Sequence, residues 1–131
     1  DVAVLKPAPR GGVAALLRVA DAIDVPVVVS GSLDSSVGLD VAVTAAASLD
    51  DLPFACGLGT GALLAADVVE TSRVTEGGVI SVGRTAPDLT ALLAARDRLG
   101  EDRAAWWRER LVAAWLAGAG ERSRWLVSDA I

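Results

Sequence analysis

Three short apolar runs constrain the fold of this chain more than any other feature of its sequence. They cover residues 2–5, 25–29 and 53–56, and they end near Lys6, Ser30 and Cys56 at similar spacing along the chain. Each run is continuous rather than alternating, which is typical of strands that are buried on both faces of a parallel sheet. We therefore expect an α/β fold in which these three strands are parallel and adjacent, joined by right-handed crossovers.

A helical pattern follows each of the three runs. Residues 13–23 have apolar side chains at three- and four-residue spacing, and residues 62–69 continue from a glycine-rich loop. The middle helix extends to about residue 47, with either Ser35 or Ser36 as its cap. We expect these three helices to form one outer layer over the sheet.

The pattern changes in the second half of the chain. Residues 73–82 predict a β-hairpin that turns at Gly77 and Gly78, and Thr85 is expected to cap a helix that ends before Gly100. A last helix is expected from residue 101 to about 117, ended by Gly118. The aromatic and leucine side chains expected to be buried in this region are Trp107, Leu111, Trp115 and, in the tail, Trp125.

Composition excludes several classes of partner. The net charge of −5 argues against binding to nucleic acid or to an anionic membrane, and no apolar run approaches the roughly 20 residues that span a bilayer. The single cysteine, Cys56, allows no internal disulfide and fits a reducing cytoplasm. The absence of histidine removes the commonest general base and metal ligand. We expect a cytoplasmic protein without a nucleic-acid or membrane partner.

Lys6 is the one lysine of the chain, and it follows the first expected strand directly. Proton transfer that needs an amine could use only this residue, because arginine stays protonated in proteins. In a buried cleft, desolvation would lower the pKa of a lysine and let it act as a base or acid near neutral pH. The alternative is that Lys6 only caps the strand.

Small polar residues and glycines follow the other two expected strands. Ser30 and Ser32 flank Gly31, and residues 57–61 form a glycine-rich loop whose backbone N–H groups could bind an anion. Because carboxyl ends of parallel strands share one edge of a sheet, we expect Lys6, Ser30 or Ser32 and the backbone of residues 57–59 to meet in one cavity. The serines could instead serve as caps and turns, and the glycine loop could be a plain turn.

Two other kinds of site are disfavoured. Gly57, Gly59 and Ala62 match the dinucleotide-binding pattern G-x-G-x-x-A, but a hairpin follows the next helix instead of a further parallel strand. The acidic residues lie mainly in connectors and on helix faces, so we expect this chain alone to coordinate no metal. Asp34 is the one candidate ligand, and we interpret it as a loop residue.

Three ordered motifs resemble those of a known family. They are VLKPxxxGG at residues 4–12, VVSGSLDSSVG at residues 28–38 and ACGLGT at residues 55–60. Together they are similar to the o-succinylbenzoate synthase family of the enolase superfamily, which has a muconate-lactonizing-type barrel, in its actinobacterial form. The resemblance covers roughly residues 1–70 and is loose beyond residue 73.

The resemblance implies a fold and an activity. The fold would be the last three β/α units, strands six to eight, of a (β/α)7β TIM-type barrel in residues 1–70. Residues 71–131 would form a hairpin and helices that pack toward a capping domain. The activity would be that of a carbon–oxygen lyase, which dehydrates a cyclohexadiene carboxylate to o-succinylbenzoate in menaquinone biosynthesis with Mg²⁺.

The resemblance also implies roles for individual residues. Lys6 matches the catalytic lysine of the sixth strand, whereas the family's metal ligands and second lysine are expected upstream of this sequence. The residues that match substrate contacts are Ser30, Ser32, Gly57, Leu58, Gly59 and Thr60.

We therefore expect the chain to be a C-terminal part that is inactive alone and needs the N-terminal part of the same enzyme, with a small carboxylate as substrate. An N-succinylamino acid racemase of the same superfamily and a non-catalytic α/β assembly partner remain as alternatives.

Overall fold

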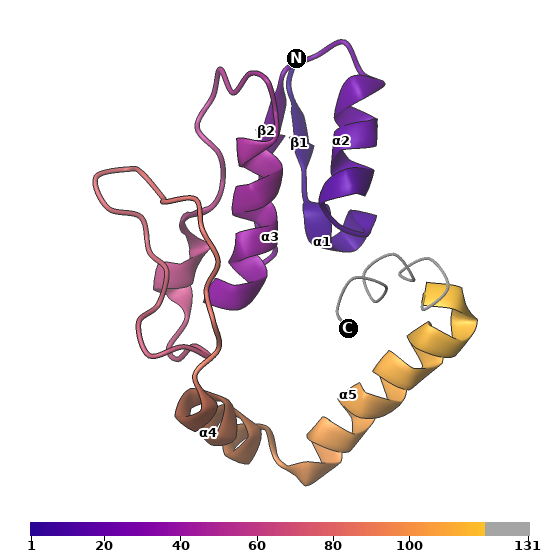
Figure 1. Cartoon of the computed structure of the whole chain (residues 1–131), viewed down its shortest axis with the longest axis vertical. Coiled ribbons are helices and arrows are strands. Elements are labelled where there is room, and N and C mark those ends of the chain that lie inside the picture. The colour runs from indigo at the N-terminus through magenta and orange to yellow at the C-terminus, as the bar shows by residue number, and fades with distance from the viewer. Residues whose placement is uncertain (120–131) are drawn as a thin grey trace, which may run out of the picture. The chain divides into compact units, whose positions relative to one another are not determined.

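The computed structural model describes residues 1–119, which belong to two compact units, Asp1–Leu92 and the residues from Leu93 onward. Figure 1 shows the order of the elements along the chain. The first unit holds strands β1 (Ala3–Leu5) and β2 (Val27–Val29), helices α1 (Pro7–Arg10), α2 (Val13–Asp21) and α3 (Ser36–Ala47), and the 3₁₀ turn η1 (Gly59–Leu63). Helix α4 (Leu89–Leu99) starts in the first unit and ends in the second, which continues with α5 (Glu101–Ala114) and η2 (Trp115–Ala119).

Strands β1 and β2 form a parallel pair, as the sequence predicts. Ala3 lies opposite Val27 and Leu5 lies opposite Val29. Leu5, Val27 and Val29 are buried in a core that also includes residues of α2 and α3, and these two helices pack against each other. The helix between the two parallel strands is the expected crossover of a β/α unit.

Only one face of this sheet is covered by the described residues. Side chains alternate between the two faces of a strand, so Val4 and Val28 lie opposite the buried residues. Val4 is 59% exposed. The prediction that both faces are buried is therefore wrong for this part of the chain, and we call the side that carries Val4 and Val28 the open face.

Helix α3 begins where the sequence predicts. Ser35 is its N-cap, and the Ser35 side chain accepts a hydrogen bond from the Gly38 N–H at 3.3 Å. Leu39 and Ser36 of this helix are fully buried. The cap places the start of α3 directly after the loop that leaves β2.

The predicted third strand is reduced to a single parallel bridge. Gly57 pairs with Ser30: the Gly57 N–H donates to the Val29 carbonyl at 2.8 Å, and the Gly31 N–H donates to the Gly57 carbonyl at 3.0 Å. Residues 53–56 themselves are not a strand. Pro53 has no N–H to donate to a ladder, and Phe54 is 52% exposed, so neither hydrogen bonding nor burial holds this stretch in a strand.

The predicted third helix, residues 62–69, is wrong. The chain makes the short turn η1 and becomes extended at Leu64. Further along, the Asp67 carboxylate accepts hydrogen bonds from the Ser36 N–H at 3.1 Å, the Ser36 hydroxyl at 2.5 Å and the Val68 N–H at 2.7 Å. These bonds tie the segment to the start of α3 and compete with a local helix.

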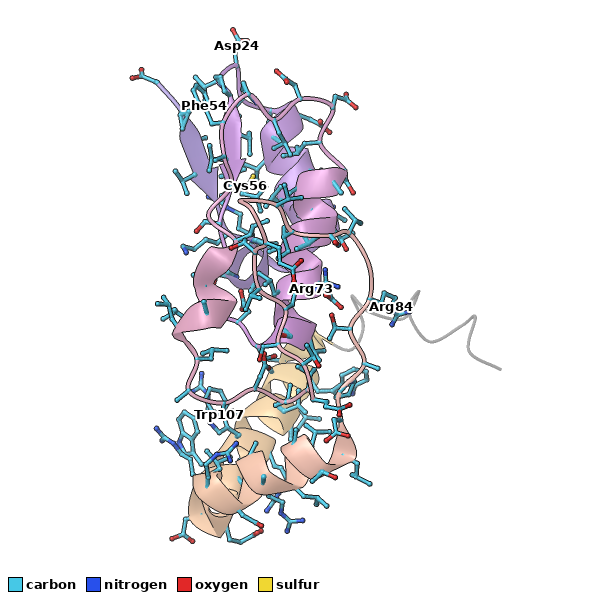
Figure 2. All side chains as sticks on the ribbon, turned by 90° about the vertical axis from the view of Figure 1, so that its left-hand side faces the viewer. Asp24, Phe54, Cys56, Arg73, Arg84 and Trp107 are labelled. Atoms are coloured by element: carbon cyan, nitrogen blue, oxygen red, sulfur yellow. The ribbon has the colours of Figure 1, made fainter. Side chains whose placement is uncertain are left out.

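A second polar contact holds the following segment against α3. The Arg73 guanidinium lies 3.0 Å from Asp40, both side chains being about 15% exposed, and it also donates to the Thr85 hydroxyl at 3.0 Å. Thr85 is therefore engaged with α3 and does not cap α4, contrary to prediction; Asp88 does so by accepting from the Ala91 N–H at 2.8 Å. Figure 2 shows Arg73 well away from both Phe54 and Asp24, which lie toward the other end of this unit.

The hairpin is present as a turn with one bridge. Gly77 and Gly78 have φ values of 57° and 82°, and Glu76 pairs with Val79 in antiparallel fashion. The left-handed conformation of both glycines is that of a tight hairpin turn. The predicted turn is confirmed, whereas the longer flanking strands are not formed.

The second unit has the predicted helices but not the predicted buried side. Gly100 and Gly118 have φ values of 78° and 94°, and they interrupt the helical path after α4 and within η2. Trp107, Leu111 and Trp115 are all more than half exposed, so none of the three is buried by the described residues of this unit. The expected anchor Trp125 lies outside the described residues.

Trp106 is the aromatic residue with the closest charged neighbours on α5. The guanidinium groups of Arg103 and Arg110 lie 4.7 and 4.8 Å from the centre of its ring. Trp106 also meets Trp107 edge-to-face at 4.7 Å. Within residues 1–119, no helix is long and apolar enough to cross a membrane.

Candidate functional site

Lys6 lies at the carboxyl end of β1, beside the end of β2. The register of the two strands places Lys6 next to Ser30, and alternation puts both on the same face as Val4 and Val28. The Lys6 ammonium donates hydrogen bonds to the Ser30 hydroxyl, at 3.1 Å, and to the Gly31 carbonyl. The Ser30 hydroxyl also donates a hydrogen bond to the Gly31 carbonyl, at 3.3 Å. A cation is thus fixed at the edge of the open face.

The ammonium group has capacity for one more partner. It carries three N–H donors, of which two are engaged by Ser30 and Gly31, and no third acceptor is present in residues 1–119. Both acceptors are neutral, so the positive charge of Lys6 is not paired with a carboxylate there. Lys6 is exposed in the described structure rather than buried in a cleft. The arrangement can present a positive charge and a proton to an anionic ligand on the open face.

Gly57 completes this cluster from the third segment. A side chain at this position would approach the Ser30 hydroxyl to 3.0 Å, so glycine permits the close bridge between the two segments. The Gly57 N–H donates a hydrogen bond to the Val29 carbonyl, and the Leu58 N–H donates one to the Cys56 carbonyl at 3.1 Å. Leu58 is 4% exposed and its side chain belongs to the core. The first two amides of the glycine loop are therefore used within the chain.

The other expected contacts lie in the loops around Gly31. The Ser32 N–H donates to the Asp34 carboxylate at 2.7 Å, and the Ser32 residue is exposed. The Thr60 hydroxyl oxygen is shielded from solvent and has no hydrogen-bond partner within the described part of the chain. It would lie 3.5 Å from a Cβ on Gly31, so Thr60 borders the same loop. Gly59 instead adjoins Thr75.

The described residues do not fit a magnesium site. No group of three or more acidic or cysteine side chains in residues 1–119 could hold a metal ion. The carboxylate of Asp34, the one candidate, accepts the Ser32 N–H. Mg²⁺ prefers several oxygen ligands in octahedral geometry, which these residues do not supply.

An apolar cavity of about 240 Å³ lies elsewhere in the first unit, between α3 and the hairpin segment. Its lining is almost entirely apolar, and it includes Cys56 and Leu58 but neither Lys6 nor Ser30. Its other lining residues are Val43, Ala46, Ala47, Leu52, Phe54, Ile80 and Val82. The polar cluster therefore faces a different space from this cavity.

Sequence reasoning missed the polar network that ties residues 67–73 to the start of α3. Burial alone would raise the pKa of the Asp67 carboxyl. Hydrogen bonds to its carboxylate outweigh this effect and lower the pKa below the usual 3.8; they come from the Ser36 side chain, the Val68 and Ser36 backbones and the Ser72 side chain. The Arg73 N–H donates to the Ser36 hydroxyl at 2.7 Å. These partners lie far apart in the sequence, so no local pattern indicates them.

A lysine at the end of one parallel strand, held by serine and glycine from the next, defines a strand-end site of the kind that α/β proteins use. No family model matches the chain. The chain is 50% identical over 115 residues to the o-succinylbenzoate synthases of Mycobacterium tuberculosis and Mycobacterium bovis. It is 49% identical over 113 residues to the o-succinylbenzoate synthase of Mycolicibacterium smegmatis.

Each of these alignments covers 86% of the chain and 34% of the relative. The comparisons confirm the resemblance drawn from the motifs: over the part that it spans, the chain is similar to o-succinylbenzoate synthases. It spans about a third of the length of these curated relatives.

Proposed function

We propose that this chain is part of an o-succinylbenzoate synthase, a carbon–oxygen lyase of the enolase superfamily. Together with the remainder of the enzyme, it would dehydrate a cyclohexadiene carboxylate to o-succinylbenzoate for menaquinone synthesis. The observation that carries the proposal is the 50% identity to synthases over 86% of the chain. The cluster of Lys6, Ser30 and Gly31 supports it, because it offers the charge that the reaction requires at a strand end.

We assign the catalytic role to Lys6. The dehydration removes a proton from the carbon next to a carboxylate, forms an enolate and releases hydroxide with a proton as water. A cation beside the developing enolate lowers the free energy of that intermediate, and Ser30 and Gly31 orient the Lys6 ammonium for this purpose. Mg²⁺ has no ligand set in the described residues, so no step is assigned to it here.

Substrate binding falls to the neighbouring loops in this proposal. Ser30 and Ser32 follow β2; Gly57 forms the bridge to Ser30, and Leu58, Gly59 and Thr60 follow that bridge. The shielded Thr60 hydroxyl without a partner supports a polar contact at this edge, because a buried hydroxyl is costly when it is unbonded.

The remainder of the same enzyme is the proposed partner of the open face. Val4 lies on that face and is largely exposed, and the two strands cannot close a barrel. The chain spans about a third of its relatives, so the missing two thirds could supply the covering strands. The isolated chain would then be inactive. One lone cysteine and the absence of long apolar runs support a cytoplasmic location.

The experiment compares the full-length protein that contains this chain with the chain alone. Formation of o-succinylbenzoate by the full-length protein, but not by the isolated chain, is expected. The same preparations are tested for racemisation of N-succinylamino acids. Racemisation without dehydration would replace the synthase proposal by a racemase, and the absence of both activities would leave only an assembly role.

A further inference from the structure

The turn η1 packs closely against the chain at Arg73. A Cβ on Gly61 would meet the Arg73 carbonyl oxygen at 2.5 Å, and a Cβ on Gly59 would lie 3.7 Å from the Thr75 side chain. Only a residue without a Cβ permits the first of these approaches. Thr60 lies between the two glycines, and its hydroxyl oxygen is shielded from solvent without a partner in the described part of the chain. The turn is therefore supported on both sides of this hydroxyl.

Arg73 is fixed to α3 through its backbone and its side chain. The Arg73 N–H donates to the hydroxyl of the fully buried Ser36 at 2.7 Å. The guanidinium lies 3.0 Å from Asp40, and it donates to the Thr85 hydroxyl and the Ser81 carbonyl. Because both charged side chains are about 15% exposed, removing either one would leave the other poorly solvated and without its counter-ion. These contacts hold the Arg73 carbonyl in one place.

The supported turn reaches the cluster around Lys6. A Cβ on Gly31 would lie 3.5 Å from the Thr60 hydroxyl oxygen, so this oxygen borders Gly31. The Gly31 carbonyl accepts a hydrogen bond from the Lys6 ammonium. A shift of the Arg73 carbonyl would therefore move the Thr60 hydroxyl relative to the ammonium. Displacements of this kind matter, because groups that bind a substrate act only in the correct geometry.

We propose that Arg73, held by Asp40, is a positioning residue of the substrate site: its carbonyl supports η1 and so fixes the Thr60 hydroxyl for a hydrogen bond to the substrate. The inference rests on the proposed function, because it takes the edge beside Lys6 as the substrate site. Arg73 acts only through Thr60, since all three of its guanidinium nitrogens are engaged with Asp40, Thr85 and Ser81.

The test uses Arg73→Gln in the full-length protein, because glutamine removes the charge and cannot bond on all sides of the guanidinium. The Michaelis constant should rise about three- to tenfold, the value of one hydrogen bond, while kcat stays within about twofold. Thr60→Val, which removes the hydroxyl, should raise the constant by the same factor. Because Arg73 acts through Thr60, the double variant should raise it no further.

Two control variants separate positioning from stability. Leu16→Ala opens a cavity at a fully buried leucine of α2, and it should lower the melting temperature without changing the Michaelis constant. Glu101→Gln weakens the exposed pairs of Glu101 with Arg96 and Arg108, and it should change neither quantity.

Three results would overturn the inference. The first is an unchanged Michaelis constant in Arg73→Gln, and the second is a double variant whose rise is the product of the two single rises. The third is an equal rise in Leu16→Ala, which would show that the constant follows stability alone. If Arg73→Gln does not fold, Asp40→Asn is judged by the same criteria, because it removes the opposite charge and keeps the shape of the side chain.

Titration with o-succinylbenzoate separates this inference from the proposed function. Affinity weakened by the same factor in Arg73→Gln, in Thr60→Val and in the double variant supports the positioning role. This result would stand even if the full-length protein performed no dehydration, which would refute the synthase proposal alone. Absence of both turnover and binding in the unsubstituted protein refutes both.

Discussion

Replacing Ser36 by alanine should destabilise the protein far more than an ordinary serine substitution. The Ser36 residue is fully buried, and its hydroxyl makes two hydrogen bonds that join distant segments. It donates to the Asp67 carboxylate at 2.5 Å and accepts from the Arg73 N–H at 2.7 Å. The substitution removes both bonds and leaves a carboxylate oxygen and an amide without that partner.

The size of the effect follows from these two losses. A buried group left without its hydrogen bond costs about 1–3 kcal/mol, with charged groups at the upper end. For Ser36→Ala we therefore expect a loss of about 2–4 kcal/mol in the free energy of unfolding. Urea titration of the full-length protein, followed by tryptophan fluorescence and far-UV circular dichroism, measures it.

Ser48→Ala is the matched control at the other end of α3. The Ser48 hydroxyl donates only to the Thr44 carbonyl, at 2.8 Å, and the site is exposed. Its loss should cost at most about 1 kcal/mol. Equal and small effects of the two substitutions would show that the Ser36 hydrogen bonds do not hold residues 67–73 to α3, and the reasoning would be refuted.

Three further predictions concern the same unit. Because the pKa of Asp67 is lowered, its carboxylate stabilises the fold above about pH 4 and loses that contribution as the pH falls through the lower folded value; Asp67→Asn should flatten the stability profile there, as acid titrations would show. Gly61→Ala should cost about 1–3 kcal/mol, because its Cβ would meet the Arg73 carbonyl oxygen at 2.5 Å, whereas Gly59→Ala should be mild in the same denaturation assay. Ser30→Ala should mainly raise the Michaelis constant, and an unchanged value would exclude a binding contact.

Local patterns predicted the parts of the fold that local physics controls. The apolar runs around Val4 and Val28 and the helix between them gave the parallel pair, and Ser35 acts as the expected cap. The pairing of Lys6 with Ser30 also follows, because equivalent strand ends in a parallel pair are neighbours.

The errors arose where distant polar contacts override local preference. Residues 62–69 are rich in helix-forming alanine and leucine, yet Asp67 binds Ser36 and the chain takes an irregular path. The Arg73–Asp40 pair joins residues far apart in the sequence, and it draws Thr85 away from its expected role as a cap. Such contacts leave no periodic signal. The prediction of a buried aromatic stripe on α5 is wrong, because periodicity cannot indicate whether a partner surface is present.

The most direct test of the central claim is the turnover of Lys6→Arg beside Lys6→Ala in the full-length protein. Arginine keeps the charge, but its larger planar guanidinium cannot reproduce the compact contacts of the ammonium with Ser30 and Gly31, so the charge would no longer lie in the same place. We predict that both substitutions lower kcat for o-succinylbenzoate formation by about 10²–10⁴-fold, with circular dichroism spectra unchanged. Near-normal turnover in Lys6→Ala would contradict the catalytic role and make Lys6 a structural cation.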